Sequence, residues 1–292
     1  MKDKINKISI RFFKDREVRA SWDETNSRWL FSVVDVIAIL TDSKNPSNYW
    51  KVMKHRLTKS GSELVTKCNQ LKMVASDGKR YLTDCLPQED LLTLIESTPS
   101  KTAIPFAKWL ITGEDQLDSK SRDKAYRLWD SSLMQTIEVG SIKGLQQIHS
   151  FLFGGLYDFA GKIRTKNIAK GGFQFAMAQF LNQSLYVIER MPETTFDEII
   201  DKYVEMNVAH PFMEGNGRST RIWLDLMLKR SLKKCVDWSK VDKNQYMEAM
   251  RESVMNSTKI KALLETALTD LINDRELFMK GIDYSYYYEQ ND

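Results

Sequence analysis

The segment His210–Arg221, with the sequence HPFMEGNGRSTR, decides the fold. Apolar residues recur every three or four positions on both sides of it, which predicts one helix before the segment and another from about residue 218. Gly215 and Gly217 permit backbone conformations in which successive N–H groups converge on one point. Such a loop at the positive end of a helix is typical of a phosphate-binding site.

The polar side chains of this segment suit chemistry at a phosphate. Arg218 and Arg221 are three positions apart, so both project from one helix face and can bind adjacent phosphates. Glu214 offers the hard oxygen that Mg²⁺ takes from a protein beside phosphate oxygens and water. His210 can accept a proton near neutral pH. Separately these residues fit a helix cap, a loop charge and surface arginines, but together they predict attack on a nucleotide phosphate.

The same segment is identified as the Fic-domain motif HPFx(D/E)GN(G/K)RxxR, which it matches at every specified position. The segments 145–149 and 156–164 also resemble those that precede the motif in Fic proteins. The resemblance spans about residues 120–290. It implies a helical Fic domain with a short β-hairpin flap, and therefore a mainly α fold for most of the chain.

The resemblance implies transfer of AMP from ATP to a Tyr, Ser or Thr hydroxyl of a target protein, with Mg²⁺ as cofactor. His210 is implied to be the base and Phe212 to anchor the loop. Gly217 favours AMP transfer, because the kinase-like branch of the family has Lys at this position. The implied ligands are Glu214 for Mg²⁺; Gly215, Asn216, Gly217 and Arg218 for the phosphate chain; and Arg221 for the γ-phosphate.

The flap is expected where residues 163–168 could pair with a glycine-rich segment. That segment consists of Gly171, Gly172, Phe173, Gln174 and Phe175. The resemblance implies that the flap aligns the backbone of the target as an added strand. The target protein is not identified by the sequence, and a homo-oligomer stays open.

The chain ends in a tyrosine-rich segment, and Gly281 is expected to stop the helix before it. Ser285 and Glu289 resemble the inhibitory helix (S/T)xxxE(G/N) of Fic proteins, near residues 283–290, although Gln290 departs from the pattern. The resemblance implies that Glu289 pairs with Arg221 and takes the place of the γ-phosphate. The alternative is a surface helix anchored by its tyrosines, which are also candidates for self-modification: Tyr284, Tyr286, Tyr287 and Tyr288.

The first third of the chain predicts a small α+β domain over residues 1–115, followed by the Fic domain over 116–292. Strands are expected near 8–12, 17–20 and 29–32, with a helix over 33–40 and a second helix capped by Ser47. Asp77-Gly78 suits a type I′ turn between strands at 71–74 and 80–83.

The order helix, basic helix, hairpin is that of a winged helix-turn-helix module. The helix carries Lys51, Lys54, His55 and Arg56, and the whole surplus of four positive charges lies in residues 1–115. Segments 29–36 and 80–83 resemble the N-terminal domain of phage antirepressor and baculovirus repeated-ORF proteins, which implies DNA as a partner. The alternative is that these charges are only the solvated faces of the domain.

The composition, 42% hydrophobic and 28% charged over 292 residues, fits a folded chain without a membrane span or a secretion signal. Cys68, Cys85 and Cys235 form no CxxC pair and are expected to be buried thiols in a reducing cytoplasm. We retain three functions: an autoinhibited adenylyltransferase, a DNA-binding regulator whose Fic domain senses nucleotide, and transfer of phosphate or phosphocholine. His210 favours an enzyme, since a sensor has no use for a base.

Overall fold

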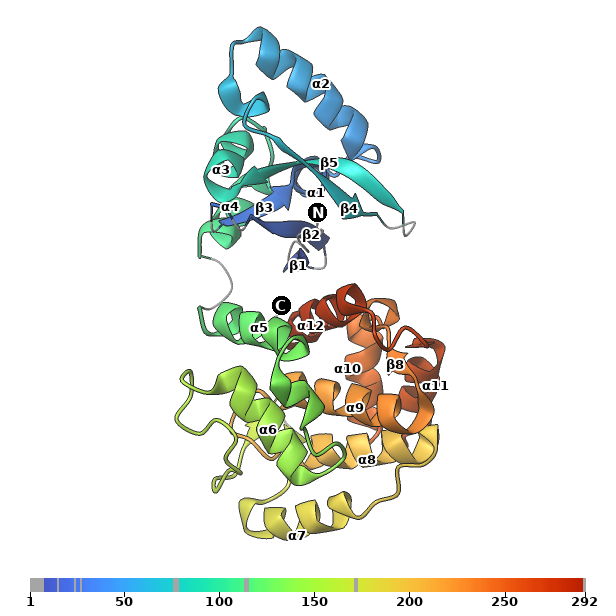
Figure 1. The fold of residues 1–292 in the computed structure, drawn as a ribbon. Coiled ribbons are helices and arrows are strands. Elements are labelled where there is room, and N and C mark those ends of the chain that lie inside the picture. Colours follow the sequence, from blue (N-terminus) through green and yellow to red (C-terminus); the bar gives the residue numbers. More distant parts are fainter. Residues whose placement is uncertain are drawn as a thin grey trace. The chain divides into compact units, whose positions relative to one another are not determined.

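The computed structural model describes residues 8–14, 16–23, 25–26, 28–75, 79–112, 116–170 and 173–290. The chain divides into two compact units, one up to Gln116 and one from Leu117 onward. Each is described by itself (Figure 1). The expected turn residues Asp77 and Gly78, and the expected flap residues Gly171 and Gly172, lie outside the described residues.

The N-terminal unit contains a five-stranded antiparallel sheet in the order β1-β2-β3-β5-β4. Side chains of Val18, Ala20 and Phe31 contribute to the main core of this unit, and Met73 and Cys85 belong to a second, smaller cluster. The strands are β1 (Ile8–Phe13), β2 (Arg16–Asp23), β3 (Arg28–Ser32), β4 (Asn69–Val74) and β5 (Arg80–Pro87).

Helices pack against this sheet and share the main core of the unit with it. They are α1 (Val33–Thr41), α2 (Pro46–Lys59), the short η1 (Glu63–Val65), α3 (Gln88–Glu96) and α4 (Ala103–Thr112). The N-cap of α2 is Asn45, not the expected Ser47, because Pro46 takes the first helical position, where a missing N–H costs nothing. The predicted order of helix, helix and hairpin is present, but β5 also pairs with β3. The hairpin is therefore part of the large sheet and does not stand alone as a wing.

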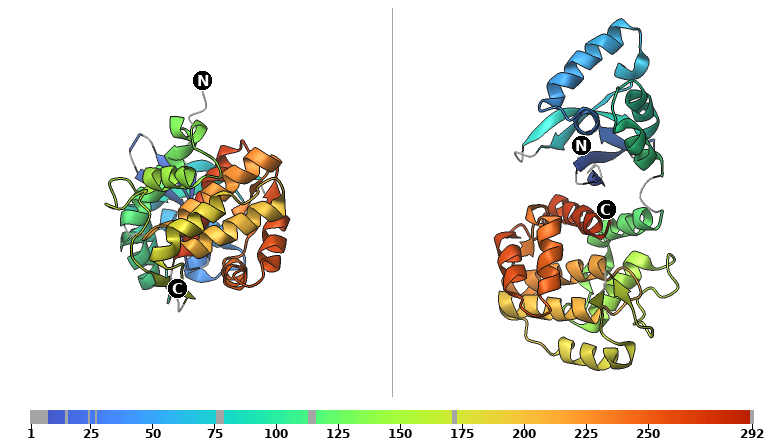
Figure 2. Two further views of the ribbon diagram at one scale, coloured as in Figure 1. Left: turned by 90° about the horizontal axis from the view of Figure 1, so that it is seen from below. Right: turned by 180° about the vertical axis from the view of Figure 1, so that it is seen from behind.

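The second unit is mainly helical, as expected. Its central helix is α9 (Asn216–Leu232), which is buried along much of its length and contacts α6, α8 and α12. The other helices are α5 (Gln116–Trp129), η2 (Ser132–Gln135), α6 (Ile142–Phe153), α7 (Ala178–Glu189), α8 (Phe196–Ala209), η3 (Trp238–Lys240), α10 (Lys243–Glu252), α11 (Thr258–Thr266) and α12 (Arg275–Glu289). Both units can be followed from below and from behind in Figure 2.

Two short antiparallel pairs complete this unit. They are β6 (Ala169–Lys170) with β7 (Phe173–Gln174), and β8 (Cys235–Val236) with β9 (Leu268–Thr269). A hairpin therefore forms at the expected place, but its first strand is 169–170 and not 163–168. The expected pairing holds at the end of 163–168, where the carbonyl of Ile168 accepts from the N–H of Phe175 (3.3 Å). The start of that segment does not pair as predicted, because Arg164 is buried and donates to the carbonyl of His210.

Helix α12 runs without a break through Gly281, so the expected helix stop at this glycine is wrong. The reason is packing. A Cβ atom at position 281 would lie 3.1 Å from Cδ1 of Trp238, so a small residue lets the helix approach the indole. Among the described residues, no helix combines the length and the apolar character that crossing a bilayer requires.

Candidate active site

The chain turns sharply at His210, the residue that ends α8. Its φ of 50° and ψ of 65° lie in the left-handed region, which is uncommon for residues other than glycine. Arg164 stabilises this conformation: its Nε donates to the carbonyl of His210 (2.7 Å), and its Nη2 donates to the carbonyl of Ala209 (3.0 Å). The backbone N–H of Arg164 also donates to the carbonyl of Pro211 (2.8 Å). The entry to the loop is thus fixed from outside the loop.

The loop itself is closed by Asn216. The side-chain oxygen of Asn216 accepts from the N–H of Phe212 and its amide donates to the carbonyl of Phe212, both at 2.8 Å. The Phe212 side chain is fully buried. Gly215 has a φ of 78°, and a Cβ there would lie 2.4 Å from the ring of Phe153. The loop is therefore compact, and α9 begins directly after Gly215.

The ring of His210 is prepared to accept a proton. Its Nδ1 donates to the carbonyl of Asn207 (3.2 Å), and since a carbonyl can only accept, Nε2 is the unprotonated nitrogen. The ring stacks on Phe175, with 3.6 Å between ring centroids and 15° between planes. Burial lowers the pKa of His210 to about 4, so the imidazole is neutral at pH 7.

His149 holds the loop from beneath, a role that sequence reasoning missed. Its Nδ1 accepts from the N–H of Gly161 (2.9 Å), and its Nε2 donates to the carbonyl of Glu214 (2.8 Å). Its ring stacks on Phe212 at 3.8 Å between centroids, and burial lowers its pKa to about 4. In the sequence, His149 is only the last residue of the segment 145–149, which resembles those that precede the motif in Fic proteins. Its partners are 12 and 65 positions away, so no local spacing could have identified them.

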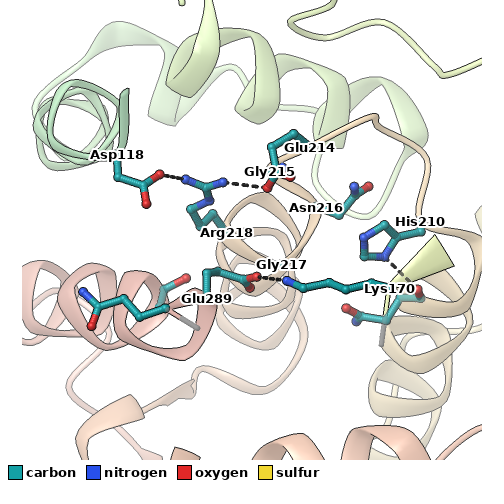
Figure 3. A network of polar contacts seen from close by, with 12 residues as sticks. Asp118, Lys170, His210, Glu214, Gly215, Asn216, Gly217, Arg218 and Glu289 are labelled. Carbon is teal, nitrogen blue, oxygen red and sulfur yellow. Dashed lines mark hydrogen bonds and ion pairs between the residues drawn. The ribbon is translucent and has the colours of Figure 1, made fainter. Parts of the chain in front are cut away.

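Glu214 and Arg218 form a chain of charges that ends at Asp118 of α5 (Figure 3). Oε1 of Glu214 accepts from the N–H of Gly215 (3.0 Å) and from Nη2 of Arg218 (2.9 Å). Nη1 of Arg218 contacts the carboxylate of Asp118. The guanidinium is 5% exposed, so these two carboxylates fix its direction. Asp118 lies 100 positions from its partner and was not predicted.

The second carboxylate oxygen of Glu214 could bind a metal ion only if phosphates and water supplied the other ligands of that ion. The side chain is 53% exposed, and Oε2 accepts no hydrogen bond from the described part of the chain. Within those residues, no three His, Cys, Asp or Glu side chains lie close enough together to hold a metal by themselves. A single free carboxylate oxygen fits Mg²⁺ that takes its remaining ligands from phosphates and water.

Arg221 is occupied by the end of α12. Its Nη2 donates to Oε1 of Glu289 (2.6 Å) and to the carbonyl of Ser285 (2.8 Å), and its Nε donates to Oγ of Ser285 (2.7 Å). The side chain is 3% exposed, and the rings of Tyr246 and Tyr288 lie beside the guanidinium. The structure thus brings both expected inhibitory residues to the arginine that closes the motif.

The carboxylate of Glu289 remains ionised in this position. Burial alone would raise its pKa, but Arg221 and Lys170 together lower the pKa to about 2. Nζ of Lys170 lies 3.4 Å from Oε2 of Glu289. A Cβ at position 217 would lie 2.1 Å from Oε1, so Gly217 leaves the space that the carboxylate fills.

The described part of the flap packs beside the base. Phe175 contacts His210, Phe173 meets Phe175 edge-on at 5.2 Å, and Gln174 is exposed. The candidate tyrosines of α12 are buried: Tyr286 donates to Oγ of Ser121, and Tyr288 donates to the carbonyl of Trp238, both at 2.8 Å. In this arrangement the hydroxyls of Tyr286 and Tyr288 face other elements of the fold.

Comparison with known proteins gives the class of this site. Residues 140–228 match the Fic/DOC family. This segment carries the loop, both arginines and His149. The chain therefore contains a Fic/DOC domain that is homologous to protein adenylyltransferases.

Individual relatives are similar over about half of this chain. Protein adenylyltransferase VbhT of Bartonella schoenbuchensis is 32% identical over 154 residues, which cover 48% of this chain and 32% of that protein. "Probable protein adenylyltransferase Fic" of Salmonella typhimurium is 25% identical over 151 residues, which cover 46% of this chain and 75% of that protein. The match thus spans about a third of the first relative.

Two similar solved structures are of Bartonella proteins. The BepC protein of Bartonella tribocorum, with bound AMPPNP, has a TM-score of 0.45 and 20% identity, over 56% of this chain and 90% of that chain. A Fic domain from Bartonella quintana, with bound ADP, has a TM-score of 0.44 and 17% identity, over 53% and 83% of the two chains.

Proposed function

We propose that the chain is a protein adenylyltransferase that moves AMP from ATP to a Tyr, Ser or Thr hydroxyl of a target protein. One observation carries the proposal: a neutral histidine with a free Nε2 stands beside a closed loop that presents a helix N-terminus and two arginines. The homology to protein adenylyltransferases supports it. A nucleotide sensor would need the anion site but not the base.

In the proposed reaction, Nε2 of His210 takes the proton of the target hydroxyl as its oxygen attacks the α-phosphorus. The bond between the α-phosphorus and the bridging oxygen breaks, and pyrophosphate leaves. The stacked ring of Phe175 and the Nδ1 bond to Asn207 keep the imidazole in one orientation during the transfer. The flap residues 171–175 are proposed to align the target backbone beside β7.

The nucleotide is proposed to lie along the first turn of α9. The first N–H groups of a helix have no partner within it, so those of Asn216 and Gly217 can donate to phosphate oxygens. Arg218 and Arg221 would bind the phosphate chain. Glu214 would hold Mg²⁺, which neutralises phosphate charge.

We further propose that the end of α12 inhibits the reaction. Glu289 occupies Arg221, which the γ-phosphate needs, and Ser285 holds the same guanidinium. A closed-state preference of about 2.7 kcal/mol would leave roughly one per cent of molecules competent. In this proposal a signal that detaches α12 restores activity, and self-modification of its tyrosines also requires that release.

The test uses the full chain as wild type, Glu289→Gly, and Glu289→Gly with His210→Ala. Each is incubated with Mg²⁺ and cell lysate, with ATP labelled at either the α- or the γ-phosphate. We expect strong protein-bound α-label only with Glu289→Gly, and a loss of about 10²- to 10⁴-fold when His210 is also removed. Transfer of γ-label alone would instead identify a kinase, and no transfer would favour the regulator.

DNA binding by the N-terminal unit is a second candidate function. Lys54 is ion-paired with Asp84 (2.7 Å) and contributes little, but Lys51, Arg56 and Lys59 are exposed on α2. Phosphate contacts by these cations would make binding fall steeply with salt. A mobility-shift titration at two salt concentrations, with wild type and Lys51→Gln/Arg56→Gln, tests this. Equal binding by both proteins would contradict it.

A further inference from the structure

The carboxylate of Glu289 lies between two cations that come from different elements. Oε1 is 2.6 Å from Nη2 of Arg221 on α9. Oε2 is 3.4 Å from Nζ of Lys170 on β6 (Figure 3). Arg221 belongs to the motif, whereas Lys170 belongs to the flap. The position of the carboxylate is therefore an anion site with two positive charges, only one of which the motif explains.

The two cations differ in what else holds them. Arg221 is 3% exposed and is also bound by Ser285, so it is fixed in place. The side chain of Lys170 is 55% exposed, and Glu289 is its ion-pair partner. An ammonium on a flexible stem can follow an anion of different shape, because its three donors rotate freely. When Glu289 leaves, both charges remain beside the same space.

We propose that Lys170 binds the terminal phosphate of ATP together with Arg221, so that the flap supplies part of the nucleotide site. This inference rests on the proposed function, in which the γ-phosphate replaces Glu289. A phosphate carries more charge than a carboxylate and offers three oxygens, so it can satisfy both cations at once. ADP has no group at this position and makes no contact with Lys170.

This contact couples the two substrates of the proposed reaction. Lys170 pairs with Phe173 in the flap hairpin. A triphosphate that holds Lys170 also holds the first strand of the flap. A target strand that orders the flap would in turn strengthen ATP binding by the same factor, because binding coupling is reciprocal.

The experiment measures nucleotide affinity in full-length Glu289→Gly, in which the anion site is open. Isothermal titration with ATP and with ADP, each with Mg²⁺, is carried out on this protein and on versions that add Lys170→Ala, Lys170→Arg or Lys166→Ala. Lys166 is an exposed lysine of the segment before the flap and is the matched control. We expect Lys170→Ala to weaken ATP binding about three- to tenfold and to leave ADP binding unchanged.

The conservative variant and the control complete the test. Lys170→Arg should restore most of the ATP affinity, and Lys166→Ala should change neither affinity. Equal weakening of ATP and ADP by Lys170→Ala would show a structural role and overturn the inference, and so would unchanged ATP binding. Failure of Glu289→Gly itself to bind either nucleotide would reject the proposed function as well, which separates the two failures.

Discussion

The motif loop and helix α12 meet at Arg221, but they differ in how far along the chain their stabilising contacts reach. The loop is closed by Asn216, which bonds the backbone of Phe212 four positions away. The end of α12 is attached by long-range contacts, from Ser285 to Arg221 and from Tyr286 to Ser121, 64 and 165 positions apart. The bonds that close the loop are thus local, although Arg164 and His149 also hold it from elsewhere in the chain. The attachment of the end of α12, by contrast, depends on these long-range contacts.

The largest expected effect comes from breaking the loop with Asn216→Ala. The change leaves the N–H and the carbonyl of Phe212 buried without their partner, which should lower the free energy of unfolding of the helical unit by about 2–4 kcal/mol. Urea unfolding of the full chain, monitored through hydrogen exchange in peptides from α9, measures this free energy. Asn207→Ala, which loses only a bond to a carbonyl of its own helix, should have a much smaller effect.

A smaller effect is expected from loosening α12 with Ser285→Ala. The change removes one of the bonds that hold Arg221 and leaves Glu289 in place, so basal AMP transfer should rise about three- to tenfold, short of Glu289→Gly. The transfer of α-label from ATP to protein, measured with Ser285→Ala as the single substitution, tests this. Ser253→Ala removes a buried hydroxyl far from the motif in sequence and should leave transfer as in wild type. Unchanged activity of Ser285→Ala would contradict the proposal that this serine helps to hold α12 in the inhibitory position.

A further effect is expected from pH. Because the pKa of Glu289 is lowered from 4.5 to about 2, its ion pair should stabilise the fold fully above about pH 4.5 and be lost as pH falls toward 2. The difference in urea midpoint between wild type and Glu289→Gln should therefore be constant from pH 7 to 5 and shrink below 4.5. Glu265→Gln, on the exposed side of α11, is the control. A difference that already disappears at pH 5 would contradict the ionised pair.

The sequence predicts the elements whose signals are local. The motif loop between two helices and the main strands follow from glycines, periodicity and alternation within short windows. Thr195 caps α8 with a full capping box, as its spacing to Glu198 indicates. In each case the residue and its partner lie within a few positions, where sequence patterns carry information.

Apart from the cap of α2, which lies at Asn45 because of the adjacent Pro46, the features that the sequence does not reveal depend on partners far along the chain. Glycine is the residue that most often ends a helix, but Gly281 lies inside α12, where its lack of a side chain lets the helix approach Trp238. No sequence spacing relates these two residues. The same holds for His149 and Asp118, which meet the loop through the fold alone. Lys170 could not be assigned to the site, because its partner Glu289 lies 119 positions later.

Helix α12 is one rod of 15 residues, about 22 Å long, capped by Asp274 at one end and carrying Glu289 at the other. Arg275 in its first turn is ion-paired with Asp130 (2.9 Å), far from the motif. The same helix is thus held at its first turn by one ion pair and at its last turn by Arg221, so the position of Glu289 depends on contacts at both ends of α12.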